Sequence, residues 1–410
     1  MSYPLVRIEE CARIVSGATP STTKPDFWNG RIMWATPADL SKLDGPFISE
    51  TPRTITEAGL ESCAAEVLPP HSVLFSSRAP IGHVAINTAP MATNQGFKSF
   101  IPNPTRLDAQ YLYFWLRAHR PYLESLGNGA TFKEVSKAVV SRIEIPLPPL
   151  DEQRRIAAIL DQADDLRRKR REALGRLSLL SQSCFEEQFG DPMSNTKGFP
   201  QAILENLIDP SRPVTYGILM PGPDIEDGVP YIRVVDIQNG SIQLGGIRKT
   251  TREIAEQYKR STISSGDLLL SIRGHVGRMA IVPDQLTGAN ITQDTARLAF
   301  LGADTIYVKS LLETKQAKNW MDQRTKGAAV RGLNLGDLRK MPIALPPLPL
   351  QRAFAARVAE IDKLKAHHRA HLARLDALFA SLQHRAFRGD LAALSFSRSR
   401  EKVASRSEVG

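Results

Sequence analysis

The chain has 410 residues, of which 42% are hydrophobic, and this length and composition accommodate about two or three globular domains. No run of about 18 apolar residues and no apolar N-terminal signal is present, which excludes a membrane-spanning helix and predicts a cytoplasmic protein. The formal net charge of +10 favours a polyanionic partner such as nucleic acid, and the three cysteines lack the C-x-x-C spacing of a zinc or redox site.

Residues 1–145 are predicted to form a first globular domain. Short β-branched runs at 31–35, 73–75 and 83–86 predict strands. The spacing of Thr54 and Glu57 fits a helix capping box, and Asp108 is a predicted N-cap for a helix over 109–117. Strands and helices follow no regular alternation, which predicts an α+β domain.

Residues 146–190 are predicted to form one long helix. A proline cluster at 146–149 is followed by more than 35 residues without proline, which indicates a helix start and an uninterrupted helix. Apolar side chains recur three and four residues apart, with Arg170 interrupting the row, which predicts a coiled coil. The residues predicted to face a partner helix include Ile156, Ile159, Leu166, Leu177 and Leu180.

The second half of the chain repeats the first at an offset of 195 to 198 residues. The repeated features are a capping box from Thr250, a strand before Arg273, an N-cap at Asp304 before a helix over 305–312, Gly327, and the prolines at 346–347. This repeat predicts a second α+β domain over 191–343, with strands at 231–235, 268–272 and 278–282. A second long helix is predicted over 344–390, and residues 391–410 are predicted to be a disordered tail.

The two long helices are predicted to pack against each other as an antiparallel coiled coil. A long amphipathic helix must bury its apolar row, and the domain between the helices has to return the chain. The residues of the second helix predicted to face the first are Phe354, Ile361, Leu364, Leu375 and Leu378. Arg170 and His368 occupy the same repeat position and are expected to come close in such a pair.

Two groups of residues resemble catalytic or metal-binding patterns. Asp284, Glu313 and Lys315 fit the loose pattern of a metal-dependent nuclease, but the matching helix of the first domain carries no such residues. His367 and His371 are four residues apart but lack the glutamate of the zinc-protease motif. No nucleotide-binding glycine motif or amino-methyltransferase motif is present, so we expect no catalytic site and no metal site.

Polar and basic loop residues of both domains are candidates for DNA contact. Asn and Gln can pair with adenine and Arg or Lys with guanine, although ordinary turns and solvated surfaces contain the same residues. The candidates in the first domain are Trp34, Thr36, Arg78, Asn94, Gln95, Lys98, Asn128, Thr131 and Lys133. The candidates in the second domain are Arg233, Arg273, His275, Asn290, Gln293, Lys326 and Arg331. A run of cations at 167–171 adds positive charge to the first long helix, and it suits phosphates, an acidic partner or solvent.

A junction sequence that occurs twice carries a resemblance to a known family. Ile145 to Arg154 and Ile343 to Arg352 both fit I-x-(I/L)-P-P-L-x-x-Q-R, and a glycine-centred loop precedes each. With the duplicated order and the length, these features resemble the specificity subunit of type I restriction-modification systems over nearly the whole chain. The second junction departs from the first because its helix start lacks acidic residues.

The resemblance implies two target recognition domains alternating with two long spacer helices, in a subunit without a catalytic site or a bound cofactor. Each domain would read one half of a bipartite double-stranded DNA target, and the helix pair would hold the domains at a fixed separation. Two methyltransferase subunits, which bring S-adenosylmethionine, would dock on this subunit, and motor-nuclease subunits using ATP and Mg would complete the enzyme. A stand-alone sequence-specific DNA-binding regulator is the alternative interpretation.

The duplication separates two classes of loop residue. If the domains read different sequences, residues identical in both suit scaffold or phosphate contact, as do Arg78 with Arg273 and Gly129 with Gly327. Differing residues are the better candidates for base reading. These pairs are Trp34 with Ile232, Ala35 with Arg233, Pro80 with His275, Asn128 with Lys326, and Thr131 with Ala329.

Overall fold

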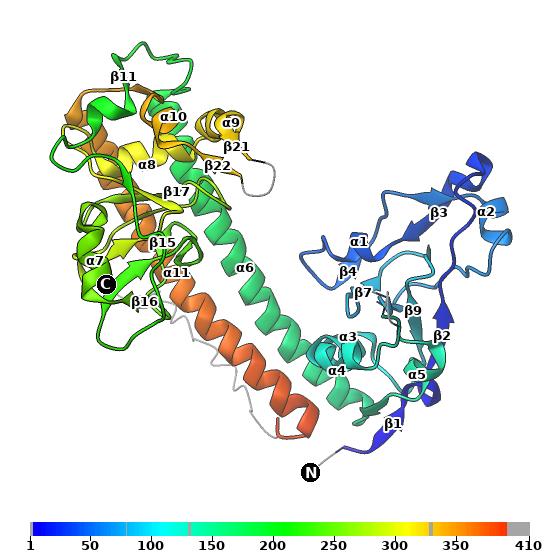
Figure 1. The fold of residues 1–410 in the computed structure, drawn as a ribbon. Helices are drawn as coiled ribbons and strands as arrows, with labels where there is room; N and C mark the ends of the chain where they lie inside the picture. The colour runs from blue at the N-terminus through cyan, green and yellow to red at the C-terminus, as the bar shows by residue number, and fades with distance from the viewer. Residues whose placement is uncertain (1–2, 79, 130–132, 328–330, 392–410) are drawn as a thin grey trace, which may run out of the picture. The chain divides into compact units, whose positions relative to one another are not determined.

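The computed structural model describes residues 3–78, 80–129, 133–327 and 331–391, which fall into two compact units. Unit 1 comprises Met1–Glu172 with Arg369–Gly410, and unit 2 comprises Ala173–His368. The helices α6 (Leu150–Phe189) and α11 (Leu348–Arg388) each contribute one part to each unit. Both units combine small mixed sheets with helices, so the predicted α+β class with two long helices is confirmed (Figure 1).

Unit 1 is built on a five-stranded sheet of order β2-β9-β6-β7-β4 and a three-stranded sheet of order β5-β3-β8. Two apolar runs pair as the antiparallel strands β6 and β7 of a hairpin. The turn between them contains Gly82 at a positive φ of 96°, which glycine adopts readily. The strands are β1 (Leu5–Arg7), β2 (Ala12–Ser16), β3 (Trp28–Ala35), β4 (Phe47–Ile48), β5 (Thr54–Ile55), β6 (Val73–Phe75), β7 (Val84–Asn87), β8 (Met91–Thr93), β9 (Lys98–Pro102) and β10 (Glu144–Pro146). The helices besides α6 are α1 (Pro37–Leu40), α2 (Glu57–Glu61), α3 (Ala109–Ala118), α4 (Arg120–Ser125) and α5 (Lys137–Ser141).

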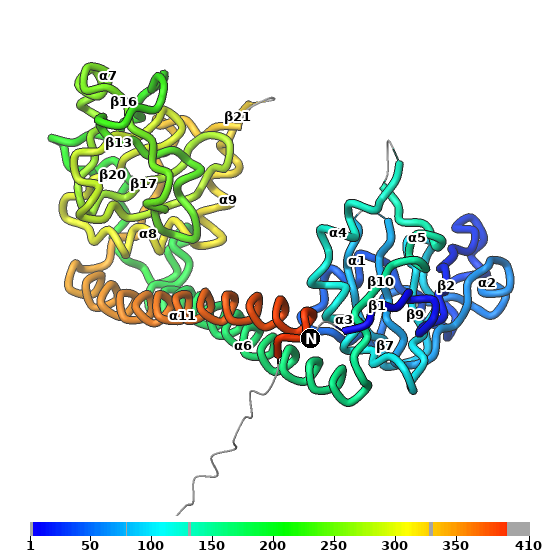
Figure 2. Tube along the Cα trace, turned by 90° about the horizontal axis from the view of Figure 1, so that it is seen from below, coloured from blue at the N-terminus to red at the C-terminus, as the bar shows by residue number. Residues whose placement is uncertain are grey.

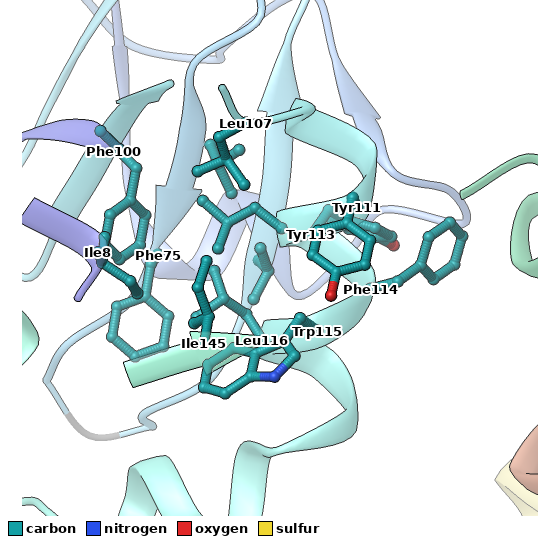
Figure 3. Packing of buried hydrophobic residues seen from close by; sticks show 14 of the residues in the cluster. Ile8, Phe75, Phe100, Leu107, Tyr111, Tyr113, Phe114, Trp115, Leu116 and Ile145 are labelled. Carbon is teal, nitrogen blue, oxygen red and sulfur yellow. The ribbon is translucent and has the colours of Figure 1, made fainter. Parts of the chain in front are cut away.

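The core of unit 1 surrounds α3. Six consecutive residues of this helix, from Tyr111 to Leu116, are at most 3% exposed, so neighbours cover the helix on all sides. Figure 3 shows its side chains in one cluster with Phe75 and Phe100 of the five-stranded sheet. The ring of Phe114 also lies 6.3 Å from the ring of Phe379 in α11. This shared core joins the globular domain to the long helices.

Unit 2 repeats this arrangement with a four-stranded sheet of order β12-β20-β17-β18 and a three-stranded sheet of order β16-β13-β19. The chain trace of Figure 2 labels β13, β16, β17 and β20 of these sheets together with α8. The helix α8 shares a core with β17, β20 and the first part of α11. The strands are β11 (Gln201–Ile203), β12 (Thr215–Tyr216), β13 (Val229–Ile232), β14 (Ile237–Gln238), β15 (Ser241–Ile242), β16 (Arg248–Thr250), β17 (Leu268–Ser271), β18 (Met279–Ile281), β19 (Asn290–Ile291), β20 (Thr295–Leu298), β21 (Thr325–Lys326), β22 (Gly332–Leu333) and β23 (Pro342–Ala344). The helices besides α11 are α7 (Arg252–Gln257), α8 (Thr305–Glu313), α9 (Lys315–Arg324) and α10 (Leu335–Arg339).

A buried glutamine fixes the start of each long helix to its globular domain. Gln153 accepts a hydrogen bond from the backbone N–H of Asp108 at 2.8 Å and donates one to the carbonyl of Pro148 at 2.9 Å. Gln351 makes the same two contacts in unit 2, at 2.9 and 2.8 Å. Both helices therefore begin at the same position of the repeat, although only the first has an acidic first turn.

The two long helices run antiparallel within unit 1. Arg155 of α6 donates a hydrogen bond to the carbonyl of Leu391, just beyond α11, at 3.0 Å. Further along α6, Arg167 forms an ion pair with Asp376 at 2.6 Å. Positions along α11 thus fall as those along α6 rise, as predicted for the helix pair.

The side of each long helix that faces its partner, here called the seam, follows a heptad spacing. The buried or half-buried positions of α6 with this spacing are Ile156, Leu160, Ala163, Arg167, Arg170, Leu174, Leu177, Ser181, Cys184 and Gln188. Those of α11 are Phe354, Val358, Ile361, Lys365, His368, Leu372, Leu375, Phe379, Leu382 and Ala386. Two polar seam residues have partners across the seam: Arg167 lies 4.2 Å from the ring of Phe379, and Lys365 donates to the hydroxyl of Ser181 at 3.1 Å.

The observed seam differs from the predicted one, because five of the ten predicted residues lie on it and five lie beside it. The predicted residues that lie on it are Ile156, Leu177, Phe354, Ile361 and Leu375. Those that lie beside it are Ile159, Leu166, Leu180, Leu364 and Leu378. The four leucines are 47% to 52% exposed, so the prediction is wrong for them. A search for apolar residues selects these leucines because their neighbours in the seam include Arg167, Ser181 and Lys365, which are polar.

Two further predictions concern the approach of Arg170 to His368 and the C-terminal tail. Arg170 belongs to unit 1 and His368 to unit 2, so their predicted approach stays a prediction. Of the predicted tail, only Leu391 is described, and it is buried in the core of unit 1. Residues 392–410 lie outside the described residues.

The ends of several predicted elements shift in the structure. The predicted strand at 73–75 is confirmed as β6, and the strand at 268–272 is one residue shorter as β17. The predicted cap at Thr54 is wrong because that residue belongs to β5, and Thr56 caps α2 instead. In unit 2, Thr251 caps α7 in the same way. The strand predicted at 231–235 ends at Ile232 because a 3-10 turn begins after Arg233.

Candidate nucleic-acid interface

Three loops meet at one end of the five-stranded sheet of unit 1. The N–H of Ser77 bonds to the carbonyl of Gly96, and the N–H of Val135 bonds to the carbonyl of Ser77, both at 2.8 Å. Asn128 and Glu134 exchange backbone hydrogen bonds of 3.0 and 2.9 Å, which close the third loop. These bonds gather the described residues of 76–83, 94–98 and 127–134 into one surface, here called loop face 1.

A carboxylate stands among the cations of loop face 1. Glu134 accepts a hydrogen bond from the ammonium group of Lys98 at 3.2 Å. Its second carboxylate oxygen lies 3.8 Å from the guanidinium of Arg78. The Glu134 side chain is 36% exposed and that of Arg78 is 44% exposed, so both reach the surface. This arrangement neutralises part of the positive charge of the face.

The same three loops meet in unit 2. The N–H of Ile272 bonds to the carbonyl of Asp294, and the N–H of Leu333 bonds to the carbonyl of Ile272, both at 2.8 Å. Lys326 pairs with Gly332 between β21 and β22 and closes the third loop. We call the described residues of 272–277, 292–295 and 326–333 loop face 2.

Loop face 2 carries no carboxylate at the position of Glu134, because Gly332 stands there. Arg273 instead donates a hydrogen bond to the amide oxygen of Gln293 at 3.4 Å. Beside it lies a cleft of about 410 Å³ lined by Arg273, Arg324, Lys326, Gly332, Leu333, Asn334 and Asp337. Three of these side chains are cations and one is an anion, so the cleft suits a phosphate group.

A fourth loop, which the sequence analysis did not single out, borders each loop face. The N–H of Ala18 bonds to the carbonyl of Thr93 at 2.9 Å, and the N–H of Ile218 bonds in the same way to Ile291 at 2.8 Å. In unit 1 the next residue is Thr19, whose hydroxyl bonds to the side chain of Gln95. A glycine before each loop, Gly17 and Gly217, is the sequence signal that would have found it.

Most candidate residues that lie on the loop faces reach the surface. The exposed ones are Arg78, Gln95, Asn128, Lys133, Arg273, His275, Lys326 and Arg331. Asn94 and Gln293 are half-buried on the same faces. Thr131 lies outside the described residues.

Three candidates are buried, which corrects their expected role in contacting DNA. Trp34 is 2% exposed, and its indole N–H bonds to the carbonyl of Ala18 at 3.0 Å. Asn290 is 1% exposed and donates to the carbonyl of Ala255 at 3.2 Å. Lys98 is 7% exposed and is directed to Glu134. These side chains make contacts within the protein, and because they are buried they cannot contact DNA bound at the surface.

Thr36 and Arg233 begin equivalent turns. The backbone N–H of Thr36 bonds to the Asp39 carboxylate, and that of Arg233 bonds to the Asp236 carboxylate, both at 2.8 Å. The Arg233 guanidinium also donates to Asp236 at 2.7 Å, and this hydrogen bond raises the pKa of Arg233. Arg233 is therefore engaged within its own turn.

Matching hydrogen bonds identify equivalent residues of the two units. The carbonyl of Pro80 accepts a hydrogen bond from the hydroxyl of Ser76, and that of His275 accepts one from the equivalent Ser271. Asn128 and Lys326 occupy the same place in the bridge that closes the third loop. Both pairs agree with the sequence offset. Strand register corrects the other pairs to Trp34 with Tyr231, Ala35 with Ile232, and Thr36 with Arg233. The offset is one residue smaller in this segment, which an alignment at one constant offset misses. Thr131 and Ala329 both lie outside the described residues.

The residues of the nuclease-like pattern have separate local partners. Asp284 accepts a hydrogen bond from Ser265, and Glu313 pairs with Lys309 on the same helix at 2.8 Å. His367 and His371 are exposed on α11. In the part of the chain that the structure describes, no helix is long and apolar enough to span a bilayer.

Comparison with known proteins agrees with the duplicated architecture. The family model of the type I restriction modification DNA specificity domain matches residues 3–176 and again 223–376. The MjaIX specificity subunit of Methanocaldococcus jannaschii is 26% identical over 385 residues, covering 87% of this chain and 86% of the relative. The EcoBI specificity subunit of Escherichia coli is 30% identical over 335 residues, covering 74% of this chain and 70% of the relative.

A solved structure shares the fold. The crystal structure of the type I restriction-modification S subunit from M. genitalium superposes with a TM-score of 0.56 at 15% identity, covering 94% of this chain and 96% of that one. The repeated family match and the coverage of both relatives agree with the fold. The chain therefore belongs to the type I restriction-modification DNA specificity family, whose members are the non-catalytic specificity subunits of type I restriction enzymes.

Proposed function

We propose that this subunit recognises a bipartite double-stranded DNA target, with loop face 1 reading one half and loop face 2 the other. The observation that carries the proposal is the recurrence of one loop-built cationic surface on equivalent sheets of both units. Arg78 and Arg273 hold the same position in each, which suits contact with the phosphate backbone. Nearby positions differ, with Pro80 and Asn128 in unit 1 matched by His275 and Lys326 in unit 2, as reading two different sequences requires.

The domain assignments follow from this proposal. Residues 1–145 and 191–343 are the recognition domains, and residues 146–190 and 344–390 are the spacer helices that set the distance between the half-sites. The leucines beside the seam, Leu166, Leu180, Leu364 and Leu378, are 47% to 52% exposed and offer apolar area for docked methyltransferase subunits.

The chemistry belongs to the partners in this proposal. Two methyltransferase subunits bring S-adenosylmethionine, motor-nuclease subunits bring ATP and Mg, and this chain holds no cofactor of its own. The complex works in the cytoplasm, where its DNA target is accessible.

Mapping of methylated adenines tests the proposal. The full chain is co-expressed with the methyltransferase subunit of its restriction-modification system, and the methylated sequences of the host DNA are determined. We expect a two-part motif with an unspecified gap. A continuous short motif would contradict the proposal.

Matched variants then assign each half-site. Asn128→Ala and Lys326→Ala change equivalent, exposed residues that differ between the two loop faces, and each is expected to relax or abolish one half of the motif only. Equal loss on both halves from either variant would contradict the assignment of one half-site to each unit.

A further inference from the structure

The loop that borders loop face 2 ends in an exposed apolar tip. Leu219 is 55% exposed and Met220 is 77% exposed. The residues on either side of the tip are held in place. Ile218 is fully buried, and Pro221 accepts a hydrogen bond from the hydroxyl of Thr250 at 2.6 Å. Two consecutive apolar side chains therefore project from an anchored backbone into solvent.

The tip lies next to the polar groups of loop face 2. The carbonyl of Ile218 accepts a hydrogen bond from the backbone N–H of Gln293 at 2.9 Å, so Leu219 follows directly after this contact. The side chain of Gln293 is in turn bonded to Arg273. An apolar tip, an amide side chain and a guanidinium are thus neighbours on one surface.

Unit 1 differs at this position. Its equivalent of Leu219 is Thr19, whose hydroxyl donates a hydrogen bond to the amide oxygen of Gln95. Leucine makes no such hydrogen bond, and in unit 2 the equivalent oxygen, on Gln293, accepts from Arg273. The two loop faces therefore share a glutamine and an arginine but differ in the polarity of the bordering loop.

We propose that Leu219 and Met220 contact thymine 5-methyl groups in the half-site that unit 2 reads. The thymine methyl is the apolar feature of base edges in the major groove. The apolar tip stands at a position that differs between the two loop faces, so it suits the reading of a step that contains an A·T pair, whereas the shared Arg273 supplies the charge that holds the phosphate backbone nearby. This inference rests on the proposed function and names residues that set its specificity.

Uracil substitution tests the contact directly, because uracil differs from thymine only by the missing methyl group. The complex with its methyltransferase subunits binds duplexes of the mapped motif in which each thymine is replaced in turn. We expect at least one thymine of one half-site to show a roughly fourfold loss of affinity with uracil, the equivalent of about 0.8 kcal/mol for one methyl group. A chain carrying both Leu219→Ser and Met220→Ser is expected to bind thymine and uracil duplexes equally at that position.

Leu301→Ser is the matched control. Leu301 is 64% exposed in the same unit. It lies after the C-terminal end of β20, whereas Gln293 lies before the N-terminal end of this strand. This variant is expected to keep the wild-type preference for thymine. The melting temperature of each variant shows that the fold is retained, since all three side chains are at the surface.

Three results would overturn the inference. They are a half-site of unit 2 without an A·T pair, equal binding of thymine and uracil duplexes by the wild type, and a preference that survives in the double variant. An equal loss on both duplexes in the double variant would point to an apolar wedge between base steps instead. Absence of a two-part motif for the wild-type complex would refute the proposed function itself and is seen before any variant is made.

Discussion

At the scale of single residues, the two loop faces differ most in one charge. Glu134 lies between Lys98 and Arg78 on loop face 1, whereas Gly332 takes its place on loop face 2. In the proposed complex with DNA, the carboxylate competes with a phosphate for Arg78, which is the exposed one of these two cations. Loop face 1 is therefore expected to depend less on phosphate contacts than loop face 2 does.

Glu134→Gln tests this role of the carboxylate. Glutamine keeps an acceptor for Lys98 but removes the negative charge, which leaves Arg78 available to a phosphate. We expect tighter binding of non-specific DNA by the assembled complex, with a slope of log affinity against log salt steeper by about 0.9. Titrations at several salt concentrations measure this slope.

Glu66→Gln is the control for the change in net charge. Glu66 pairs with Arg13 on a different part of unit 1, so its loss is expected to leave the salt slope unchanged. An equal change in both variants would show that overall charge is responsible. Gly332→Glu is not a clean reciprocal change, because a Cβ at Gly332 would lie 3.2 Å from the Arg273 side chain.

Sequence reasoning found the loops that form the two loop faces but misjudged three candidate residues, which are buried. The duplicated order brought out Arg78 with Arg273 and Asn128 with Lys326, because these residues recur at similar offsets of 195 and 198 residues. It could not show that Trp34 is buried, since burial depends on neighbours that are distant in the sequence. The same limit applies to the Leu219 loop, whose importance comes from its contact with Gln293.

At the scale of elements, the helix seam shows which interactions a pattern of apolar residues misses. Lys365 lies in the seam with a partner in Ser181, whereas the adjacent Leu364 is 52% exposed. A charged side chain can occupy such a position when its alkyl part packs and its charged end finds a partner. The length and start of each helix were predictable because prolines and a glutamine mark them; the partners across the seam were not.

Two alanine substitutions separate the seam from the exposed side of α11. Ile361 is 8% exposed and Leu364 is 52% exposed. Ile361→Ala is expected to destabilise unit 2 by about 2 to 4 kcal/mol, because it leaves a cavity in the seam. Leu364→Ala is expected to cost less than about 1 kcal/mol. Chemical denaturation of the full chain measures both, and equal losses would contradict the corrected seam.

The junction glutamines give a second prediction at this scale. Gln153→Leu leaves the N–H of Asp108 and the carbonyl of Pro148 without their partner in a buried site. We expect a loss of about 2 kcal/mol or more, since each unsatisfied buried group costs about 1 to 3 kcal/mol. Gln182→Leu, at an exposed position of the same helix, is the control and is expected to be nearly neutral. A neutral Gln153→Leu would show that water replaces the lost contacts.

At the scale of the whole molecule, both long helices belong to both units, so the proposed spacer function would depend on their common length. Removing residues 171–177 from α6 and 367–373 from α11 deletes one heptad from each and keeps the seam in register. Each helix becomes about 10.5 Å shorter, and seven residues turn a helix by only about 20° less than two full turns. We therefore expect the gap of the methylated motif to shrink by about three base pairs at 3.4 Å each, with both half-sites unchanged. Deleting the heptad from α6 alone breaks the register and is expected to abolish methylation. A changed half-site sequence after the paired deletion would show that the helices shape the loop faces and do more than separate them.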